Sequence, residues 1–427
     1  MLAGLYWLSV LDRFIISLLV APIKRDLGLT DVQFGLLQGI AFALTFAIFG
    51  LFAGVMADRF SRRGVIFIGV AVWSLATTAS GVAQSFWHLM LARVGVGAGE
   101  ATLNPCATSM LTDLFPRHRI TAAMAVYAMG ATIGMGTAFL FGGWLVEVVS
   151  KSNMITLPLL GTMASWKAVF FIVGVPGALS SLLIFTVPEP VRRGQRAVAA
   201  DGRTRKSYRE LFRFINTRRR FFLCHYAGFT FASMIISGGG SWYAAHMARA
   251  FGWSPSRIGT ALGIAIATAG VTGKLICGNA VDAMYRRGLR DAQIRWYAAC
   301  LVVATPIGIV ALVSHNPWVF VFGLAAFLVL LSPLPACANA SLNLVTPNEL
   351  RGVGIALFGA VGGILGAASG PILIAAAAQH VFGSESAIGL GMASVVGVCC
   401  PLAAICLALG FRAMRDAMLD AESWDRS

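Results

Sequence analysis

Uninterrupted apolar runs recur along the whole 427-residue chain, and most are long enough to cross a lipid bilayer. A membrane-spanning helix needs about 20 predominantly apolar residues, whereas barrel strands would alternate apolar and polar positions over about ten. The pattern therefore predicts an all-α polytopic membrane protein. Its twelve expected helices lie at 2–21, 31–57, 65–84, 87–112, 120–148, 166–187, 219–247, 257–281, 294–314, 317–345, 352–379 and 386–411.

Composition supports this interpretation and excludes several classes of protein. Hydrophobic residues make up 58% of the chain and charged residues only 12%, whereas soluble domains carry about 25% charged residues. Soluble enzymes and nucleic-acid binders are therefore excluded. The eight cysteines lie in apolar runs and form no Cys-x-x-Cys pair, so neither a zinc site nor a disulfide framework is indicated. We expect no cleavable signal peptide, because the first run contains Asp12 and Arg13 and lacks a convincing cleavage site.

Positive charges are concentrated in alternate connections between the expected helices, which orients the chain. Most of the 33 Lys and Arg lie after even-numbered spans or in the C-terminal tail. The positive-inside rule then places both termini in the cytoplasm, in what we expect to be a bacterial inner membrane. The densest cluster predicts a basic cytoplasmic linker at 188–217 between six-helix bundles at 1–187 and 218–427. This linker either binds anionic lipid headgroups or, as we favour, acts as a topology signal and tether.

An internal repeat relates the two halves. Gly54–Gly64 and Gly278–Gly288 both read G-x-x-x-D-x-x-x-R-R-G and are separated by six spans. A second echo links Arg119, Gly130 and Gly134 with Arg351, Gly362 and Gly366. Both copies of each motif face the cytoplasm, so the repeats are parallel, as in two-domain secondary transporters.

Charged residues inside the spans are the main candidates for chemistry, because each costs roughly 2.5–3.5 kcal/mol at mid-membrane. They are Asp12, Arg13, Arg93, Glu100 and Lys274. Glu100 and Asp12 are candidate proton carriers, while Arg93 and Arg13 would hold the deprotonated acids or bind a phosphate through their planar guanidinium groups. The alternative is a permanently ionised network that joins spans one and four. Lys274 is expected to reach the cytoplasmic interface.

Several motifs resemble the major facilitator superfamily. Gly54–Gly64 looks like its signature loop, and Arg93–Ala101 is similar to its fourth-helix motif. The glycines of span five resemble its antiporter motif, although the usual Gly-Pro pair is absent. Leu11–Phe14 together with Gly99–Ala101 looks most like bacterial Spinster homologues. Animal Spinster-like proteins export sphingosine-1-phosphate or lysophospholipids, so the resemblance implies an amphipathic lipid as substrate.

Gate residues follow from the same resemblance and from expected helix breaks. The resemblance implies that Asp58 latches span two against span eleven when the inner side is closed, with Arg62, Gly54 and Arg119 as further gating candidates. We expect Gly238–Gly240 and Pro333–Pro335 to interrupt spans seven and ten, as hinges or as sites of close packing. Gly239 is the gating candidate in the first of these segments, and Tyr127 is a further candidate for substrate binding. For His225 and Tyr226 we favour packing over lining a cavity.

The prediction is a secondary transporter that moves an amphipathic solute by alternating access, with protons as the coupling ion carried by Glu100 and Asp12. We expect no cofactor, no metal and no nucleic acid, and a monomer whose partners are its solute and the membrane lipids. The nearest alternative is a proton-coupled multidrug exporter or small organic-anion transporter of the same fold. A channel or receptor, and a lipid-modifying enzyme, are the alternatives from other classes.

Overall fold

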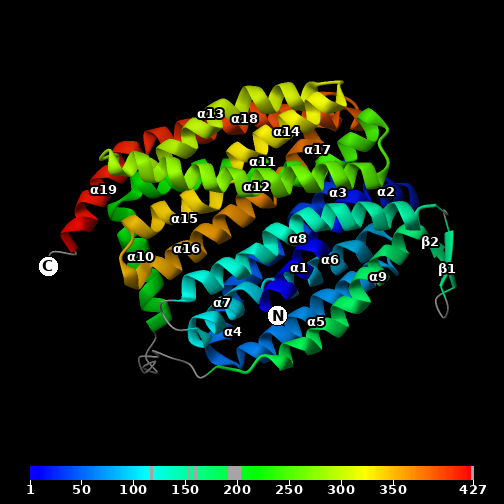
Figure 1. Ribbon diagram of the computed structural model, residues 1–427, viewed down its shortest axis with the longest axis horizontal. Coiled ribbons are helices and arrows are strands. Elements are labelled where there is room, and N and C mark those ends of the chain that lie inside the picture. The colour runs from blue at the N-terminus through cyan, green and yellow to red at the C-terminus, as the bar shows by residue number, and fades with distance from the viewer. Residues whose placement is uncertain (116–118, 152–153, 158–160, 191–202, 425–427) are drawn as a thin grey trace. The chain divides into compact units, whose positions relative to one another are not determined.

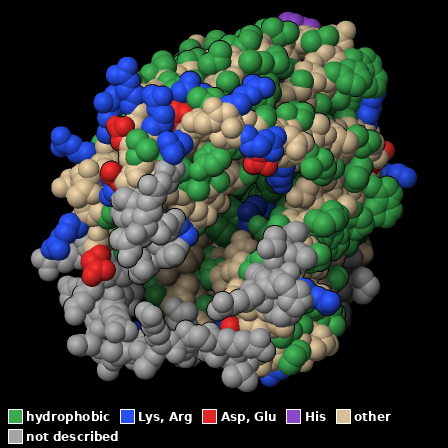
Figure 2. Space-filling model, turned by 60° about the vertical axis from the view of Figure 1, so that its left-hand side comes forward, with side chains coloured by type: hydrophobic (Ala, Val, Ile, Leu, Met, Phe, Trp, Pro, Cys, Tyr) green, Lys and Arg blue, Asp and Glu red, His purple; other side chains and the backbone are tan. Residues whose placement is uncertain are grey.

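The structure is a computed structural model that describes residues 1–427 except 116–118, 152–153, 158–160, 191–202 and 425–427. The described chain is predominantly helical, with one short strand pair (Figure 1). Large apolar side chains such as Leu75, Leu91 and Phe322 are more than half exposed. Broad hydrophobic surface is visible beside a region of gathered Lys and Arg side chains in Figure 2. Surface of this kind is expected where lipid covers the protein.

Helices account for the first six predicted spans, and a hairpin lies between the fifth and the sixth. The helices are α1 (Leu2–Ile15), η1 (Ile16–Leu18), α2 (Val20–Leu27), α3 (Asp31–Leu36), η2 (Leu37–Leu44), α4 (Thr45–Arg59), α5 (Arg62–Ser80), α6 (Phe86–Glu100), α7 (Leu103–Leu114), α8 (Ile120–Val149), α9 (Ser165–Ser180) and η4 (Ser181–Thr186). The strands β1 (Met154–Leu157) and β2 (Gly161–Ala164) pair antiparallel, with Met154 opposite Ala164.

The remaining helices account for the last six spans and add two amphipathic helices. They are α10 (Arg203–Thr217), α11 (Arg219–Phe251), α12 (Pro255–Arg286), α13 (Ala292–Val313), α14 (Pro317–Leu331), α15 (Leu334–Val345), α16 (Asn348–Val361), η5 (Gly362–Ala367), α17 (Gly370–Ala376), η6 (Ala377–Val381), η7 (Glu385–Ala387), α18 (Ile388–Leu409) and α19 (Phe411–Trp424). The helix α10 lies within the segment that the sequence analysis treats as a linker.

Among the described residues, ten helices are long and apolar enough to span a membrane, and the bent pair Leu2–Leu18 and Val20–Leu27 makes an eleventh. The remaining predicted span consists of α6 and α7, which are separated at Ala101 and Thr102. The predicted all-α membrane fold is confirmed. The two spans that depart from a simple apolar helix are the first and the fourth, which carry Asp12, Arg13, Arg93 and Glu100.

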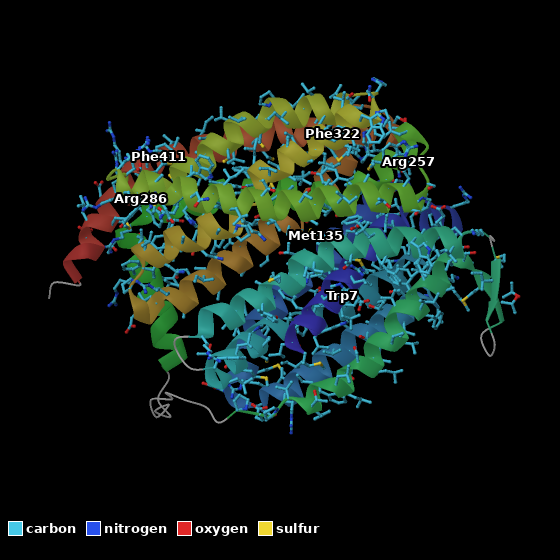
Figure 3. The ribbon with its side chains drawn as sticks, in the orientation of Figure 1. Trp7, Met135, Arg257, Arg286, Phe322 and Phe411 are labelled. Carbon is cyan, nitrogen blue, oxygen red and sulfur yellow. The ribbon has the colours of Figure 1, made fainter. Side chains whose placement is uncertain are left out.

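The described chain forms two compact units. Unit 1 contains Met1–Arg193, Gly238–Ala267 and Ala368–Gly391, so it holds one end of α11, of α12 and of span eleven together with the first six spans. Within it, α1 packs along α8, where the Trp7 indole donates to the Thr137 hydroxyl at 2.6 Å (Figure 3). The predicted division at 187 and 218 stays a prediction.

Unit 2 contains Gly194–Ser237, Thr268–Ala367 and Met392–Ser427. The imidazole of His225 is buried and its Nε2 lies 2.8 Å from the Ser341 hydroxyl. The hydroxyl of Tyr226 donates to the Gly354 carbonyl at 3.2 Å. Both side chains also contact the ring of Phe358. They are packed inside this unit, as the sequence analysis favours.

The expected break at Gly238–Gly240 is wrong, because α11 runs without interruption from Arg219 to Phe251. The glycines instead allow close packing: a Cβ on Gly238 would lie 2.9 Å from the Gly370 carbonyl oxygen, and one on Gly239 would meet the Tyr243 ring. At Pro333–Pro335 the expected interruption is present, since α14 ends at Leu331 and α15 begins at Leu334.

Replacing Gly39 by alanine is expected to destabilise unit 1, because the new Cβ would lie 2.1 Å from the Ala368 carbonyl oxygen. Overpacking against backbone costs about 1–3 kcal/mol of unfolding free energy. The melting temperature of purified protein measures this loss. Gly50→Ala is the matched control on the same span, since a Cβ there meets nothing within 4 Å. Equal melting temperatures for the two variants would contradict the close approach of η2 to residue 368.

Candidate functional site

Two neighbouring segments of unit 1 bring together four of the five charges predicted inside the spans. Asp12 and Arg13 lie near the end of α1, and Arg93 and Glu100 lie on α6. Asp12, Arg93 and Glu100 are at most 1% exposed, whereas the Arg13 side chain is 26% exposed. We call these four residues the buried charge cluster. Lys274, the fifth predicted charge, is exposed on α12 and lies outside unit 1.

Glu100 is held by α1 through one of its two oxygens. Its Oε2 accepts hydrogen bonds from Arg13 Nη2 at 2.6 Å, Arg13 Nε at 3.1 Å and the Ser9 hydroxyl at 2.9 Å. Its Oε1 is buried and accepts no hydrogen bond from any described residue. Ser9 and Arg13 are four residues apart, so they lie on the same face of α1. The ion pair therefore occupies one carboxylate oxygen and leaves the other without a hydrogen-bond donor among the described residues.

Asp12 is fully buried, and neither of its carboxyl oxygens accepts a hydrogen bond within the described residues. The groups that act on it are the Glu100 carboxylate, the Arg93 guanidinium and the Trp73 indole. Burying an ionised carboxylate with so few donors is costly in free energy. Asp12 is therefore incompletely satisfied in the arrangement observed.

Arg93 is a buried cation with unused donors. Its Nη2 lies 3.5 Å from the Arg13 carbonyl oxygen, while Nε and Nη1 donate to no described group. The Phe42 ring lies against both arginines, 4.8 Å from the Arg13 guanidinium and 5.3 Å from that of Arg93. Such cation–π contacts stabilise a guanidinium without satisfying its N–H groups. The cluster therefore has unused N–H donors that could bind an anion.

Glycines of α6 set the distance at which the neighbouring helices pack. A Cβ on Gly97 would lie 2.7 Å from the Phe42 carbonyl oxygen, and one on Gly99 would lie 2.7 Å from the Gly69 carbonyl oxygen. The repeated small residues of the fourth-helix motif thus bring η2 and α5 against α6. This close approach is what puts the Phe42 ring beside the two arginines.

A second polar cluster lies at the start of α5, around the predicted gate residue Arg62. Its guanidinium is 1% exposed and binds Asp113 at 2.5 Å, the Ser109 hydroxyl at 3.0 Å and Glu189 at 3.1 Å. Glu189 also accepts from the Ser61 hydroxyl and from the backbone N–H groups of Arg62 and Arg63. This carboxylate therefore caps the N-terminus of α5, where negative charge is favourable.

Replacing Glu189 by glutamine should remove a pH-dependent part of the stability. Partial burial opposes ionisation of Glu189, but hydrogen bonds from the Arg63 amide, the Ser61 hydroxyl and Arg62 outweigh it and lower the pKa of the carboxyl. The stabilisation is then fully present above the unfolded pKa of about 4.3 and disappears as pH falls through the lowered native value. We expect a loss of about 1 kcal/mol near pH 7, as for other helix caps.

Melting temperatures of the parent and Glu189→Gln between pH 7 and pH 3.5 test this prediction. Glu210→Gln is the control, because Glu210 is exposed on α10. The difference from the parent should shrink toward low pH for Glu189→Gln and stay near zero for the control. A difference that is independent of pH would contradict the capping role.

The other predicted site residues lie away from the buried charge cluster. Tyr127 is buried, stacks on Tyr6 at 4.8 Å and donates to the Asn104 side chain at 2.5 Å. Gly54 lies in α4 with nothing within 4 Å of a built Cβ, and Arg119 is exposed just before α8. The side chain of Asp58 lies outside the described residues, so its predicted latch stays a prediction.

Sequence reasoning missed a third cluster, which lies in unit 1 near the start of α3. The buried carboxylate of Asp31 binds Arg249 through both oxygens, at 2.5 and 2.7 Å, and accepts from Lys24 at 2.5 Å. Lys24 also pairs with Glu385, whose backbone carbonyl accepts from Arg249. Lys24 and Arg249 lie in connections between the expected spans, and nothing in the sequence pairs them with Asp31. These four residues form what we call the outer ion cluster, since they lie at span ends predicted to face outward.

Comparison with known proteins gives a single family. Residues 2–276 match the sequence profile of the Major Facilitator Superfamily. An MFS-type efflux pump of Mycolicibacterium smegmatis is 28% identical over 90% of this chain and 85% of that protein. The cis,cis-muconate transport protein of Acinetobacter baylyi is 26% identical over 89% of this chain and 86% of that protein. The mouse sphingosine-1-phosphate transporter SPNS2 is 30% identical over 35% of this chain and 29% of that protein.

Solved transporter structures have the same fold as this chain over nearly its whole length. A bacterial homologue of the human lysosomal transporter Spinster, described as inward-facing and unoccupied, has a TM-score of 0.80 and 24% identity, with 98% of this chain and 96% of that chain covered. The inward-facing, occupied form of such a homologue has a TM-score of 0.74 and 22% identity, covering 99% and 95% of the two chains.

Proposed function

Since the chain belongs to the major facilitator superfamily, whose members are membrane transporters and not enzymes, we propose that it moves an amphipathic anion by alternating access with protons as the coupling ion. The predicted resemblance to Spinster homologues is confirmed. The proposed solute class is a lysophospholipid or a sphingoid phosphate. The proposed location is a bacterial inner membrane, with both termini in the cytoplasm and the transporter working as a monomer.

The observation that carries this proposal is the pairing within the buried charge cluster. Glu100 is bound to Arg13. In contrast, both carboxyl oxygens of Asp12 and the Nε and Nη1 groups of Arg93 have no hydrogen-bond partner among the described residues. Buried charges and polar groups without partners are costly, so they are retained where they serve a function. A ligand with an anionic head would satisfy the N–H donors of Arg93.

Charge balance links the proton to the anion. With a proton on Asp12 or on Glu100, the two arginines and the remaining carboxylate leave one net positive charge, which an anionic head neutralises. When both acids are ionised, the cluster is already neutral and an added anion would be unpaired. Proton and anion therefore bind more tightly together than apart, and by linkage each raises the affinity for the other.

The transport experiment uses purified protein in liposomes with an imposed pH gradient. Labelled palmitoyl lysophosphatidate should accumulate on one side in its unchanged form, as checked by mass spectrometry, and accumulation should stop when the gradient is dissipated. Unitary currents would identify a channel, and a chemically altered lipid would identify an enzyme. Either result, or the absence of any gradient-dependent movement, would overturn the proposal.

A second candidate function is the transport of a small organic anion. The similarity to the muconate transport protein supports it, because that match extends over most of both chains. The same arginines would bind a carboxylate, and no acyl chain would be needed. Accumulation of cis,cis-muconate but not of lysophosphatidate would favour this candidate. Competition by acyl phosphates that strengthens with chain length would favour the amphiphile.

A further inference from the structure

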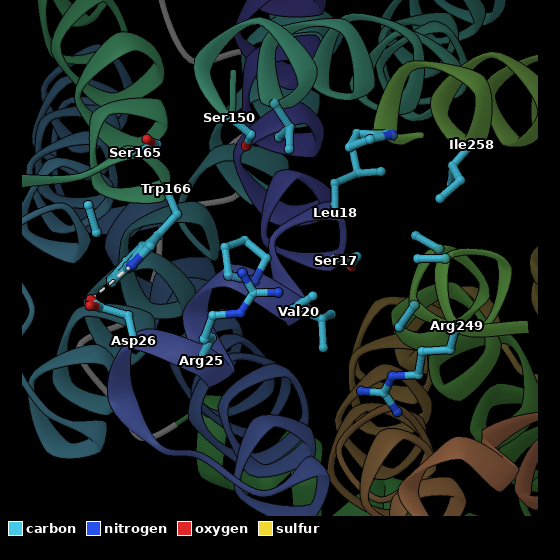
Figure 4. Close-up of a pocket in the computed structure, with 18 of the residues that line it drawn as sticks. Ser17, Leu18, Val20, Arg25, Asp26, Ser150, Ser165, Trp166, Arg249 and Ile258 are labelled. Atoms are coloured by element: carbon cyan, nitrogen blue, oxygen red, sulfur yellow. Dashed lines mark hydrogen bonds between the residues drawn. The ribbon is translucent and has the colours of Figure 1, made fainter. Parts of the chain in front are cut away.

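A cavity of about 540 Å³ lies in unit 1, away from the buried charge cluster (Figure 4). Pockets that hold small molecules usually measure about 300–1,000 Å³. The wall comes from α2, α8, the start of α9, the end of α11 and the start of α12. All of these segments belong to unit 1. The charge pattern predicts that they face outward.

The cavity exists because the first span bends. The two parts of this span, Leu2–Leu18 and Val20–Leu27, meet at 61°. Pro22 lies in the first turn of α2, where a missing backbone N–H is tolerated. Gly28 ends α2 with a φ of 64°, a left-handed conformation that favours glycine. These residues fix a short helix at an angle to α1, and the cavity lies beside it.

The lining combines exposed charges with buried apolar side chains. Arg25 and Asp26 are exposed, whereas Val20, Val146, Trp253 and Ile258 are buried. A molecule with a polar head and an apolar tail matches this lining, because the tail would be removed from water while the head stays near the surface.

The charges at the cavity leave one cation without a partner. The carboxylate of Asp26 accepts from the Trp166 indole at 3.0 Å and lies 3.6 Å from Lys167. Asp31 and Glu385 are both engaged in the outer ion cluster. Within the described residues, Arg25 makes no hydrogen bond or ion pair. Figure 4 shows its guanidinium among the lining residues, so the head that it would bind is anionic.

Arg249 connects the cavity to the outer ion cluster. It lines the cavity while three of its N–H donors are bound to Asp31 and to the Glu385 carbonyl. A guanidinium has five donors, so two remain for a ligand. An anion bound beside it would compete with Asp31 for the same positive charge.

We propose that this cavity is a second binding site, taking a single-chain amphiphile with an anionic head at Arg25 and with Arg249 beside it. The choice of an amphiphile rests on the proposed function, since the solute would occupy this site on the outer side of the transport path. Occupation would weaken the pairing of Arg249 with Asp31 and so favour separation of the segments that the outer ion cluster joins.

Binding is tested with dodecyl phosphate as the probe on protein in nanodiscs. Met154→Cys places a thiol on the exposed part of the lining, and its reaction rate with a membrane-impermeant maleimide is measured with the unsubstituted parent as background. Dodecyl phosphate should slow this reaction in a saturable way, whereas uncharged dodecyl maltoside at the same concentration should not. When Arg25→Gln is combined with Met154→Cys, the half-saturating concentration of dodecyl phosphate should rise about tenfold, as expected for one lost charge-assisted interaction.

Two further variants keep the result interpretable. Lys151→Gln removes an exposed cation that does not line the cavity and should leave protection unchanged. Ala248→Trp enlarges an exposed lining residue and should abolish protection without disturbing buried packing. Equal protection by both amphiphiles, or protection that survives Arg25→Gln and Ala248→Trp, would overturn the proposal.

The result of this binding test can be distinguished from the result of the transport experiment that tests the proposed function. Glu100→Gln should retain protection of the Met154→Cys thiol, because the buried charge cluster does not line this cavity. Transport without protection would reject the second site and leave the proposed function intact. Protection without transport would support the second site and reject the proposed function.

Discussion

Glu100→Gln is expected to lower gradient-driven accumulation of lysophosphatidate by at least about tenfold, the effect of losing about 1.4 kcal/mol of coupling free energy. Glutamine has nearly the same size and can still accept from Arg13 and Ser9, which bind Glu100 Oε2 in the parent. It cannot take up a proton. The site should therefore still bind and exchange solute, but it should no longer use the pH gradient.

The experiment separates coupling from binding. Accumulation under a pH gradient and solute exchange without a gradient are measured in the same liposomes. Loss of accumulation with exchange retained identifies Glu100 as a proton carrier. Glu210→Gln, on the exposed side of α10, should leave both rates unchanged. Equal accumulation by the parent and Glu100→Gln would leave Glu100 as a purely structural partner of Arg13.

The binding affinity gives an independent readout of the same linkage. In the parent, the Kd for lysophosphatidate should rise with pH, because deprotonation of the cluster removes its net positive charge. Glu100→Gln should weaken this dependence, and Asp12→Asn should weaken it separately if both acids carry protons. A Kd that does not change with pH in the parent would contradict the proposed coupling whatever the transport rates are.

The positions of the buried charges could be predicted from the sequence, but their partners could not. Apolar runs around Asp12, Arg93 and Glu100 already imply burial, and all three are at most 1% exposed. That Glu100 pairs with Arg13 and not with Arg93 depends on the rotation of α1 and α6 about their axes. The seven-residue spacing of Arg93 and Glu100 indicates a shared face and does not identify the helix that lies against it.

Local irregularities were the least predictable part of the fold. The run Gly238–Gly240 suggested a broken helix, yet α11 continues because span eleven packs closely against it at Gly370. The bend after Leu18 was not predicted, since residues 2–21 contain no proline and no charged residue other than Asp12 and Arg13. Helix α10 was taken for a linker because of its many basic residues, although Leu211 in that helix is buried.

Ion pairs between distant segments escape prediction for a related reason. Asp31, Arg249 and Glu385 each lie near the end of a span, where a charge is ordinary and calls for no explanation. Only the structure shows that Asp31 is fully buried and bound by two cations. The same holds for Glu189, which caps α5 from beyond the end of η4.

Arg93→Met is expected to keep the fold and to abolish high-affinity binding of the anion. The guanidinium is 1% exposed, and its Nε and Nη1 donate to no described group. Replacing a buried, incompletely satisfied charge by an apolar side chain of similar length is often neutral or stabilising. Its attraction to Glu100 and Asp12 is lost, but Glu100 keeps Arg13 and a protonated Asp12 needs no cation. We expect an unchanged or higher melting temperature and a Kd at least about tenfold weaker.

This combination of results distinguishes a binding residue from a structural one, because a structural arginine would lose stability and affinity together. Lys274→Met is the control, since it removes a cation from an exposed position on α12. A fall of more than about 3 kcal/mol in unfolding free energy would show that Arg93 is part of a stabilising network. An unchanged Kd would remove Arg93 from the anion site. Retained stability with lost affinity is the result expected for a charge that serves ligand binding. Burial of such a charge is unfavourable in the empty protein and is compensated only when the anion binds.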